Sequence, residues 1–401
     1  MNVLMLWDTH PSPYSGVGLA ALNILKQLSN RHTIQLIYLD NSEAGIDYPD
    51  LEPYCSTIDS VAYKELSPGR QLLAVARDSL SVRKLRSKYR CFFTPAYSSA
   101  MAELVQQAIS RDKHDLVYAS GRVAFYAWPF RIPKVAHPFD CLSCACYKQW
   151  RRAPNASTKA YWLFAYLTNA WTERTILGSF DDCIVVSNEE YEAYKAILPN
   201  VKCSVVPHGV DAEFFKPGKL SENWPSLVFV GPLDVSGPNV EAVLYFHSQI
   251  YGALKKQFVD LRLFVVGSRP VEAVRSLASD PSIIVTGFVQ DVRPYIASAS
   301  VVIAPFVSGT GVKTKVLEAM AMGKPVVATS IGARGINATS GEHLYVADTP
   351  VAFVDRVQEL LDDEAKRRRM GHKAREFVKK YHSWEQIAED IDYIFQRARH
   401  R

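Results

Sequence analysis

The stretch from Pro305 to Gly335, PFVSGTGVKTKVLEAMAMGKPVVATSIGARG, constrains the fold of this chain more than any other. A loop of small residues follows an apolar run, and apolar residues then recur at helical spacing until Gly323. A β-branched run comes next, so the pattern predicts a strand, a glycine-rich loop, a helix and a second strand. The first amides of a helix have no intrahelical acceptor, and this loop therefore favours an anion such as a diphosphate.

The same alternation of strand and helix runs through all 401 residues. Strands are predicted at 2–7, 33–39, 115–120, 134–139, 182–187 and 203–208, and then at 226–231, 261–267, 283–288, 301–305, 325–329 and 343–346. This pattern predicts an α/β protein with two doubly wound, Rossmann-like domains facing a cleft. The polar, proline-bearing segment 212–224 is the predicted linker between domains at 1–211 and 225–382, and 383–401 is predicted as a terminal helix.

The net charge of +5 conceals a basic region. Residues 60–160 hold 17 Lys and Arg against 6 Asp and Glu, and within them segment 68–93 interleaves basic and apolar residues. This segment is either a surface for anionic membrane lipids or a solvated helix face. Without clustered aromatic residues or a binding motif, nucleic acid is not an expected partner.

Cysteine usage and the start of the chain predict a cytoplasmic protein, peripheral on the inner face of the plasma membrane if segment 68–93 binds lipid. Seven cysteines, mostly in apolar segments, suit a reducing compartment. Cys141, Cys144 and Cys146 are close together, but no second Cys/His cluster completes a metal site, and we interpret them as core residues. The first residues predict a strand and lack the basic start of a signal peptide, and no apolar run approaches the ~20 residues of a membrane span.

Several motifs give the chain a family resemblance. They are Ser15-Gly16-Val17-Gly18, Pro207-His208-Gly209-Val210-Asp211, Phe229-Val230-Gly231, Gly287-Phe288-Val289 and the long block from Glu318 to Thr329. With them the chain resembles the retaining, nucleotide-sugar-dependent glycosyltransferases of the GT-B fold, in the family numbered four. The pattern PFxxGxGxKxKxLEAMAMG is similar to the bacterial branch that builds exopolysaccharides and lipid-linked saccharides.

The resemblance implies transfer of a hexose-type sugar, with retention, from a nucleotide sugar to a saccharide or lipid-linked acceptor, and a UDP-sugar is the expected donor. It implies no metal and no cofactor beyond the donor, and a last helix that crosses back to the first domain. Glu318 is expected to accept hydrogen bonds from the ribose, and Lys315, with Lys313 second, to hold the diphosphate. Lys315 ranks first because it shares a helix face with Glu318 at i,i+3.

The remaining predicted site residues fall into three groups. The other donor-binding candidates are Gly16, Gly18, Phe288, Val289, Gly309, Thr310, Gly311, Val312 and Leu317. His137 and Asp140 are catalytic candidates beside Lys315, although a structural role for His137 is nearly as well supported. His208 and Asp211 are expected on the acceptor side.

The chain departs from the family pattern at two places. Thr310 stands where many members have a glutamate that contacts the donor hexose, and the loop after Gly231 lacks the usual Arg and Lys. Hexose recognition is therefore expected from the 309–312 amides and the Thr310 hydroxyl. A sugar-nucleotide 2-epimerase and a non-catalytic nucleotide-sugar-binding protein remain alternatives. An NAD dehydrogenase is disfavoured because GxGxxG is absent after the first strand.

Overall fold

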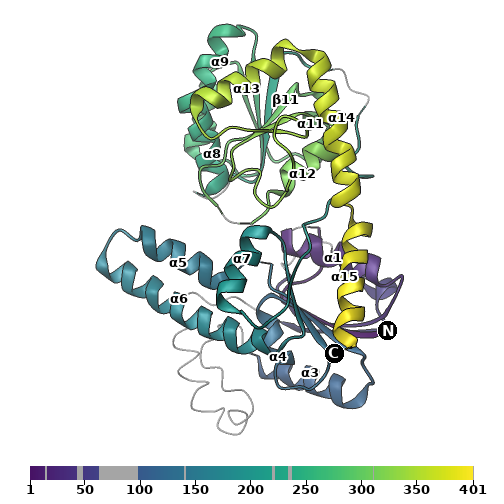
Figure 1. The fold of residues 1–401 in the computed structure, drawn as a ribbon. Coiled ribbons are helices and arrows are strands. Elements are labelled where there is room, and N and C mark those ends of the chain that lie inside the picture. The colour runs from purple at the N-terminus through teal and green to yellow at the C-terminus, as the bar shows by residue number, and fades with distance from the viewer. Residues whose placement is uncertain are drawn as a thin grey trace. The chain divides into compact units, whose positions relative to one another are not determined.

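The computed structural model describes residues 1–13, 16–42, 48–62, 98–139, 141–218, 222–233, 237–309 and 311–400. The chain forms two compact units (Figure 1). Unit 1 comprises Met1–Val206 together with Ala388–Arg401, and unit 2 comprises Pro207–Ile387. The basic segment 68–93, Asp140 and Thr310 lie outside the described residues.

Unit 1 is built on a parallel sheet of seven strands in the order β3-β2-β1-β4-β5-β6-β7. Its central strands are almost wholly apolar and buried, as a sheet covered by helices requires. The strands are β1 (Asn2–Trp7), β2 (Thr33–Asp40), β3 (Thr57–Ala62), β4 (Leu116–Ser120), β5 (Lys134–His137), β6 (Asp182–Val185) and β7 (Cys203–Val205). The α-helices are α1 (Gly16–Leu28), α3 (Ser99–Arg111), α4 (Ala124–Ala127), α5 (Leu142–Arg152), α6 (Ala156–Ile176) and α7 (Asn188–Ile197).

Unit 2 repeats this plan with six parallel strands in the order β10-β9-β8-β11-β12-β13. The strands are β8 (Ser226–Val230), β9 (Arg262–Val266), β10 (Ile283–Gly287), β11 (Val301–Ala304), β12 (Val326–Ala328) and β13 (Tyr345–Val346). The α-helices are α8 (Pro238–Phe246), α9 (Gly252–Gln257), α10 (Glu272–Arg275), α11 (Arg293–Ser298), α12 (Thr314–Ala321), α13 (Pro350–Asp362), α14 (Glu364–Tyr381) and the first residues of α15 (Trp384–Arg399).

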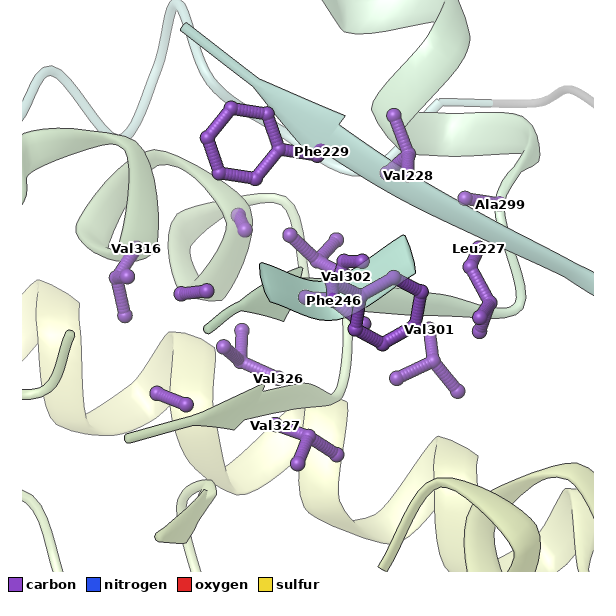
Figure 2. Close-up of a cluster of buried hydrophobic side chains, with 14 of the residues drawn as sticks. Leu227, Val228, Phe229, Phe246, Ala299, Val301, Val302, Val316, Val326 and Val327 are labelled. Atoms are coloured by element: carbon purple, nitrogen blue, oxygen red, sulfur yellow. The ribbon is translucent and has the colours of Figure 1, made fainter. Parts of the chain in front are cut away.

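The core of unit 2 fixes the start of α12 against the sheet. Figure 2 shows Phe229 from β8, Val302 from β11 and Val316 from α12 in one cluster of buried side chains, with Val326 from β12 beside them. Fully burying a side chain of this size contributes about 1.5–3 kcal/mol. The loop before α12 is therefore held between two firmly packed elements.

The predicted α/β class with two parallel sheets is confirmed. Sequence reasoning missed strand β3, whose residues alternate and are only partly buried at the sheet edge, and it missed helix α5. Among the described helices, none is long and apolar enough to cross a membrane. The six described cysteines are free thiols, with Cys141 buried and Cys144 and Cys146 partly buried.

The division between units falls after Val206, ahead of the predicted linker. That segment is bonded to unit 2: Asn223 N donates to Ser298 O at 2.7 Å, and Trp224 Nε1 donates to Leu361 O at 3.0 Å. The described residues of this segment therefore belong to unit 2, where Asn223 and Trp224 have their hydrogen-bond partners.

Helix α15 begins in unit 2 and ends in unit 1. In unit 1 the Phe395 ring lies 5.1 Å from that of Tyr118, and Asp392 lies 3.0 Å from His32 Nε2. Arg397 pairs with the buried carboxylate of Asp182 and donates to Ser204 Oγ at 2.6 Å. The residues of α15 that belong to unit 1 thus complete the interior of that unit.

Candidate functional site

The strand order of unit 2 marks one place where a ligand can reach the sheet. The order reverses between β8 and β11, and in sheets of this kind ligands bind at the carboxyl ends of the strands beside such a reversal. Gly231 follows β8, and the loop Phe306–Lys313 follows β11 and leads into α12. Lys313, Lys315 and Glu318 all lie on this loop and helix, beyond the carboxyl end of β11.

Lys315 is held in a desolvated position facing the end of β8. Its Nζ donates to Asn239 Oδ1 at 2.6 Å and lies 5.6 and 5.3 Å from the ring centres of Phe229 and Phe306. Desolvation lowers the pKa of Lys315 to about 8, although the charge of Glu318 opposes this shift. Since a buried ammonium group is costly, this arrangement suits a cation that receives an anionic partner from outside.

Glu318 lies one helical turn after Lys315 and keeps part of its surface exposed. Desolvation raises its pKa to about 7, and the charge of Lys315 acts in the opposite direction. Within the described ranges, no hydrogen bond or ion pair to its carboxylate is found. A half-buried carboxylate without a protein donor has acceptor capacity left for a ligand.

The loop before α12 takes a conformation that requires glycine. Gly309 and Gly311 have φ of 109° and 69°, a region that L side chains rarely adopt. Lys313 is the N-cap residue of α12 and is 9% exposed, and its Nζ donates to Gly311 O at 3.0 Å. The lysine therefore lies over the loop, and the helix start leaves backbone amides available for an anion.

Two residues near this loop were not predicted from the sequence. Asn239, in the first turn of α8, is oriented by a bond from its Nδ2 to Pro232 O at 2.9 Å, so its oxygen faces Lys315. Arg334 donates from Nη1 to Gly309 O at 3.1 Å. Arg334 belongs to the conspicuous stretch 305–335, but an isolated arginine after a strand carries no signal of its own.

Glycines allow the ends of β8 and β9 to approach closely. A Cβ on Gly231 would lie 2.4 Å from Lys315 Nζ and 3.1 Å from Asn239 Oδ1. A Cβ on Gly267 would lie 1.8 Å from the Gly231 carbonyl oxygen. The Lys315 amine can occupy its position because Gly231 has no side chain.

Four other predicted donor residues lie around the same edge of the sheet. Val312 packs partly against the core and Leu317 is buried in it, so Leu317 offers a ligand its backbone rather than its side chain. Phe288 follows β10 and is 78% exposed, while Val289 packs partly against the core. Because β10 is three strands from β11, the two strand ends lie about 14 Å apart.

The predicted residues of unit 1 have different surroundings. Gly16 opens α1, and a Cβ on it would have none of the described residues within 4 Å beyond its own helix and chain neighbours, whereas Gly18 is buried. His137 ends β5, is 2% exposed, bonds through Nδ1 to Tyr118 Oη at 2.6 Å and stacks on Phe139. An imidazole so deeply buried supports the strand end, which was the structural alternative for this residue.

Sequence reasoning also missed the close approach of Asp8 to the backbone of Gly121 in unit 1. Asp8 follows β1 at the point where the strand order reverses, and Ser120 Oγ donates to its Oδ1 at 3.4 Å. Gly121 has φ of 47°, and a Cβ there would lie 2.0 Å from Asp8 Oδ2. This glycine lets the Asp8 carboxylate lie against the backbone at the end of β4.

His208 and Asp211 belong to unit 2, not to the first unit as predicted. The Asp211 carboxylate accepts bonds from the Glu213 and Phe214 amides at 3.0 and 2.8 Å, so it stabilises a turn. The His208 carbonyl bonds to His382 Nδ1 at 2.8 Å, and its ring packs edge-on against Trp384. These contacts fix the segment before β8, and an acceptor-side role for the two residues stays a prediction.

Over the part of the chain that the structure describes, no group of three or more His, Cys, Asp or Glu residues is arranged to hold a metal ion. The candidate site consists of the loop before α12, the first amides of α12, and the side chains of Lys313, Lys315 and Glu318.

Comparison with known proteins assigns this architecture to a class. A family model described as Glycosyltransferase Family 4 matches residues 14–214, and one described as Glycosyl transferases group 1 matches residues 224–363. The fold is shared with Anabaena HepE, solved in complex with UDP and glucose, at a TM-score of 0.62 and 16% identity over 99% of this chain and 100% of that one. The architecture is thus that of the GT-B glycosyltransferases.

Two curated relatives match part of the chain. An uncharacterized 44.6 kDa protein in the cps region of Klebsiella pneumoniae is 25% identical over 209 residues, which cover 50% of this chain and 52% of that protein. A phosphatidyl-myo-inositol mannosyltransferase of Mycobacterium leprae is 28% identical over 201 residues, which cover 48% and 52%. These matches therefore span about half the length of each relative. On the matching family models, the chain belongs to glycosyltransferase family 4.

Proposed function

We propose that this protein transfers a hexose-type sugar, with retention of configuration, from a UDP-sugar to a saccharide or lipid-linked acceptor in cell-surface polysaccharide synthesis. Family membership supports glycosyl transfer. HepE, with the same fold, was solved with UDP and glucose, which supports the donor, and the relative in a cps region supports the pathway.

The observation that carries the proposal is the pair formed by Lys315 and Glu318. A desolvated amine with a pKa of about 8 and a carboxylate with a pKa of about 7 lie one helical turn apart, at the switch point of the sheet. We assign the diphosphate to Lys315 and the helix start, and the ribose hydroxyls to Glu318. The exposed ring of Phe288, with the backbone at Val289, is the proposed contact for the base.

The chemistry that we propose needs neither a metal nor a cofactor. As the bond from the sugar to the diphosphate breaks, negative charge grows on the leaving oxygen, where Lys315, Lys313 and the first amides of α12 stabilise it. The acceptor hydroxyl attacks from the same face, and a donor phosphate oxygen takes its proton. Positioning and charge stabilisation then supply most of the rate enhancement.

Binding of UDP and of 2′-deoxy-UDP tests the assignment of Glu318. The intact protein should bind UDP more tightly by roughly 10- to 100-fold, since a hydrogen bond to a charged group is worth about 1.5–3 kcal/mol. Glu318→Gln should lose most of this preference, whereas Glu272→Gln, at an exposed position of unit 2, should retain it. Isothermal titration provides the affinities. Failure of UDP, UDP-sugars and other nucleotide sugars to bind would contradict the proposal.

Retention is tested on the product. With a UDP-α-sugar and an accepted saccharide, nuclear magnetic resonance should show an α linkage in the first product formed. A β linkage would show inversion and exclude the proposed same-face attack.

A further inference from the structure

Helix α6 of unit 1 leaves an apolar stripe uncovered. Of its 21 residues only Glu173 and Ile176, near its end, are buried. Its outer face carries four large side chains at spacings of three, three and four residues, which place them in one row. They are Tyr161, Phe164, Leu167 and Trp171, exposed by 52, 55, 56 and 49%. A contiguous row of this kind marks an interaction surface rather than scattered apolar residues.

The same region carries positive charge and no negative charge. Residues 142–172 span α5, the connecting loop and most of α6, and they contain no Asp or Glu. Four basic residues lie among them, all exposed: Lys148, Arg151, Arg152 and Lys159. A partner for this surface must therefore accept aromatic side chains and supply anionic groups.

Helices α5 and α6 form a hairpin, lying side by side in Figure 1. The rings of Tyr147 and Tyr166 lie 5.4 Å apart, and Asn169 Nδ2 donates to Cys146 Sγ at 3.6 Å. At the base, the buried carboxylate of Glu173 accepts the Leu142 amide at 2.9 Å. These contacts hold the hairpin as one element, so stripe and cations are presented together.

We propose that the α5–α6 hairpin docks on the surface of an anionic lipid bilayer, with α6 lying in the interface. Tyrosine and tryptophan favour this depth because one end of each ring is apolar and the other polar. Lysine and arginine beside them attract anionic headgroups. A symmetric contact between two copies would oppose two cationic surfaces, because residues 142–172 contain no Asp or Glu, and this disfavours a second copy as the occupant. This docking does not depend on the proposed sugar transfer.

Vesicle flotation of the full chain tests the proposal. At low salt the protein should float with vesicles of phosphatidylcholine and phosphatidylglycerol (7:3) and much less with phosphatidylcholine alone. Phe164→Ser/Leu167→Ser and Arg151→Gln/Arg152→Gln should each weaken binding by roughly 10- to 100-fold. Val259→Ser/Val351→Ser, which alters residues 75% and 71% exposed on unit 2, is the matched control and should bind unchanged.

Several results would overturn the proposal. One is failure to float with anionic vesicles, and another is flotation that both hairpin variants leave unaffected. Self-association in sedimentation velocity that Phe164→Ser/Leu167→Ser abolishes would assign the stripe to a second copy instead. Brominated lipids provide a readout independent of these variants, because they should quench tryptophan fluorescence in the intact protein and much less in Trp171→Phe. Equal quenching in both would also overturn it.

Discussion

Replacing Lys315 with methionine should stabilise the protein while impairing its function. The pKa of Lys315 is about 8, against 10.5 for an unperturbed lysine, so charging this amine in the folded state costs about 3 kcal/mol at pH 7. Losing the bond to Asn239 offsets about 1 kcal/mol of this gain. We therefore expect Lys315→Met to raise the free energy of unfolding of unit 2 by about 2 kcal/mol, which for a unit of this size is a melting temperature higher by roughly 5 °C.

The pH dependence gives the sign of this effect independently. The unfolded chain binds the Lys315 proton more tightly than the folded protein, so the cost is full below pH 8 and disappears as the pH rises towards 10.5. The stability advantage of Lys315→Met over the unchanged protein should shrink across this window. Melting curves of both proteins between pH 7 and 10 measure the difference.

The functional loss follows from the same amine. A cation about 4 Å from a phosphate contributes about 4 kcal/mol before desolvation is counted, and we expect a net value of about 2–3 kcal/mol. Lys315→Met should then lower UDP affinity or kcat/KM by roughly 100-fold. Lys324→Met is the control, because Lys324 is also desolvated but donates to Ala297 O and should not affect UDP. A Lys315→Met protein that is less stable and still fully active would refute the reasoning.

Four further results are expected. UDP affinity should be highest between about pH 7 and 8, where Glu318 is ionised and Lys315 charged. In titration calorimetry, Glu318→Gln should abolish the decrease in UDP affinity below pH 7. Gly231→Ala should weaken UDP binding and lower the melting temperature, since its Cβ displaces the Lys315 amine and its backbone conformation is one that L side chains rarely adopt. Arg397→Met should destabilise unit 1 by about 3 kcal/mol in thermal unfolding, because it leaves the buried Asp182 carboxylate unpaired. EDTA should leave the transfer rate unchanged, and a rate restored only by a divalent ion would contradict the metal-free mechanism.

Much of the fold could be predicted from the sequence, since buried parallel strands are continuous apolar runs. The runs that became β1, β8 and β11 are of this kind. Strand β3 could not be predicted because TIDSVA is an edge strand with polar residues on it. Helix α5 is amphipathic but polar on average, with a basic last turn and only Ser143 buried, so it does not stand out as an element of the core.

The site was only partly predictable. Lys315 and Glu318 share a helix, and i,i+3 spacing therefore predicts their common face. Asn239 contacts Lys315 from α8, and Arg334 contacts Gly309 from the segment after β12, and contacts of such long range leave no local pattern. Asp211 differs, because it was predicted from a motif. Its carboxylate accepts hydrogen bonds from two backbone amides of the turn that follows it, and the motif does not show such contacts.

The course of helix α15 has a consequence for biosynthesis. Because Ala388–Arg401 belongs to unit 1 and follows unit 2 in the sequence, all of unit 2 is synthesised before unit 1 can be completed. Until residues 388–401 have been synthesised, Asp182 lacks Arg397 and Tyr118 lacks Phe395. Residues 1–206 expressed alone would therefore lack part of the core of unit 1. A peptide of residues 384–401 added in trans is expected to bind this fragment and complete its core.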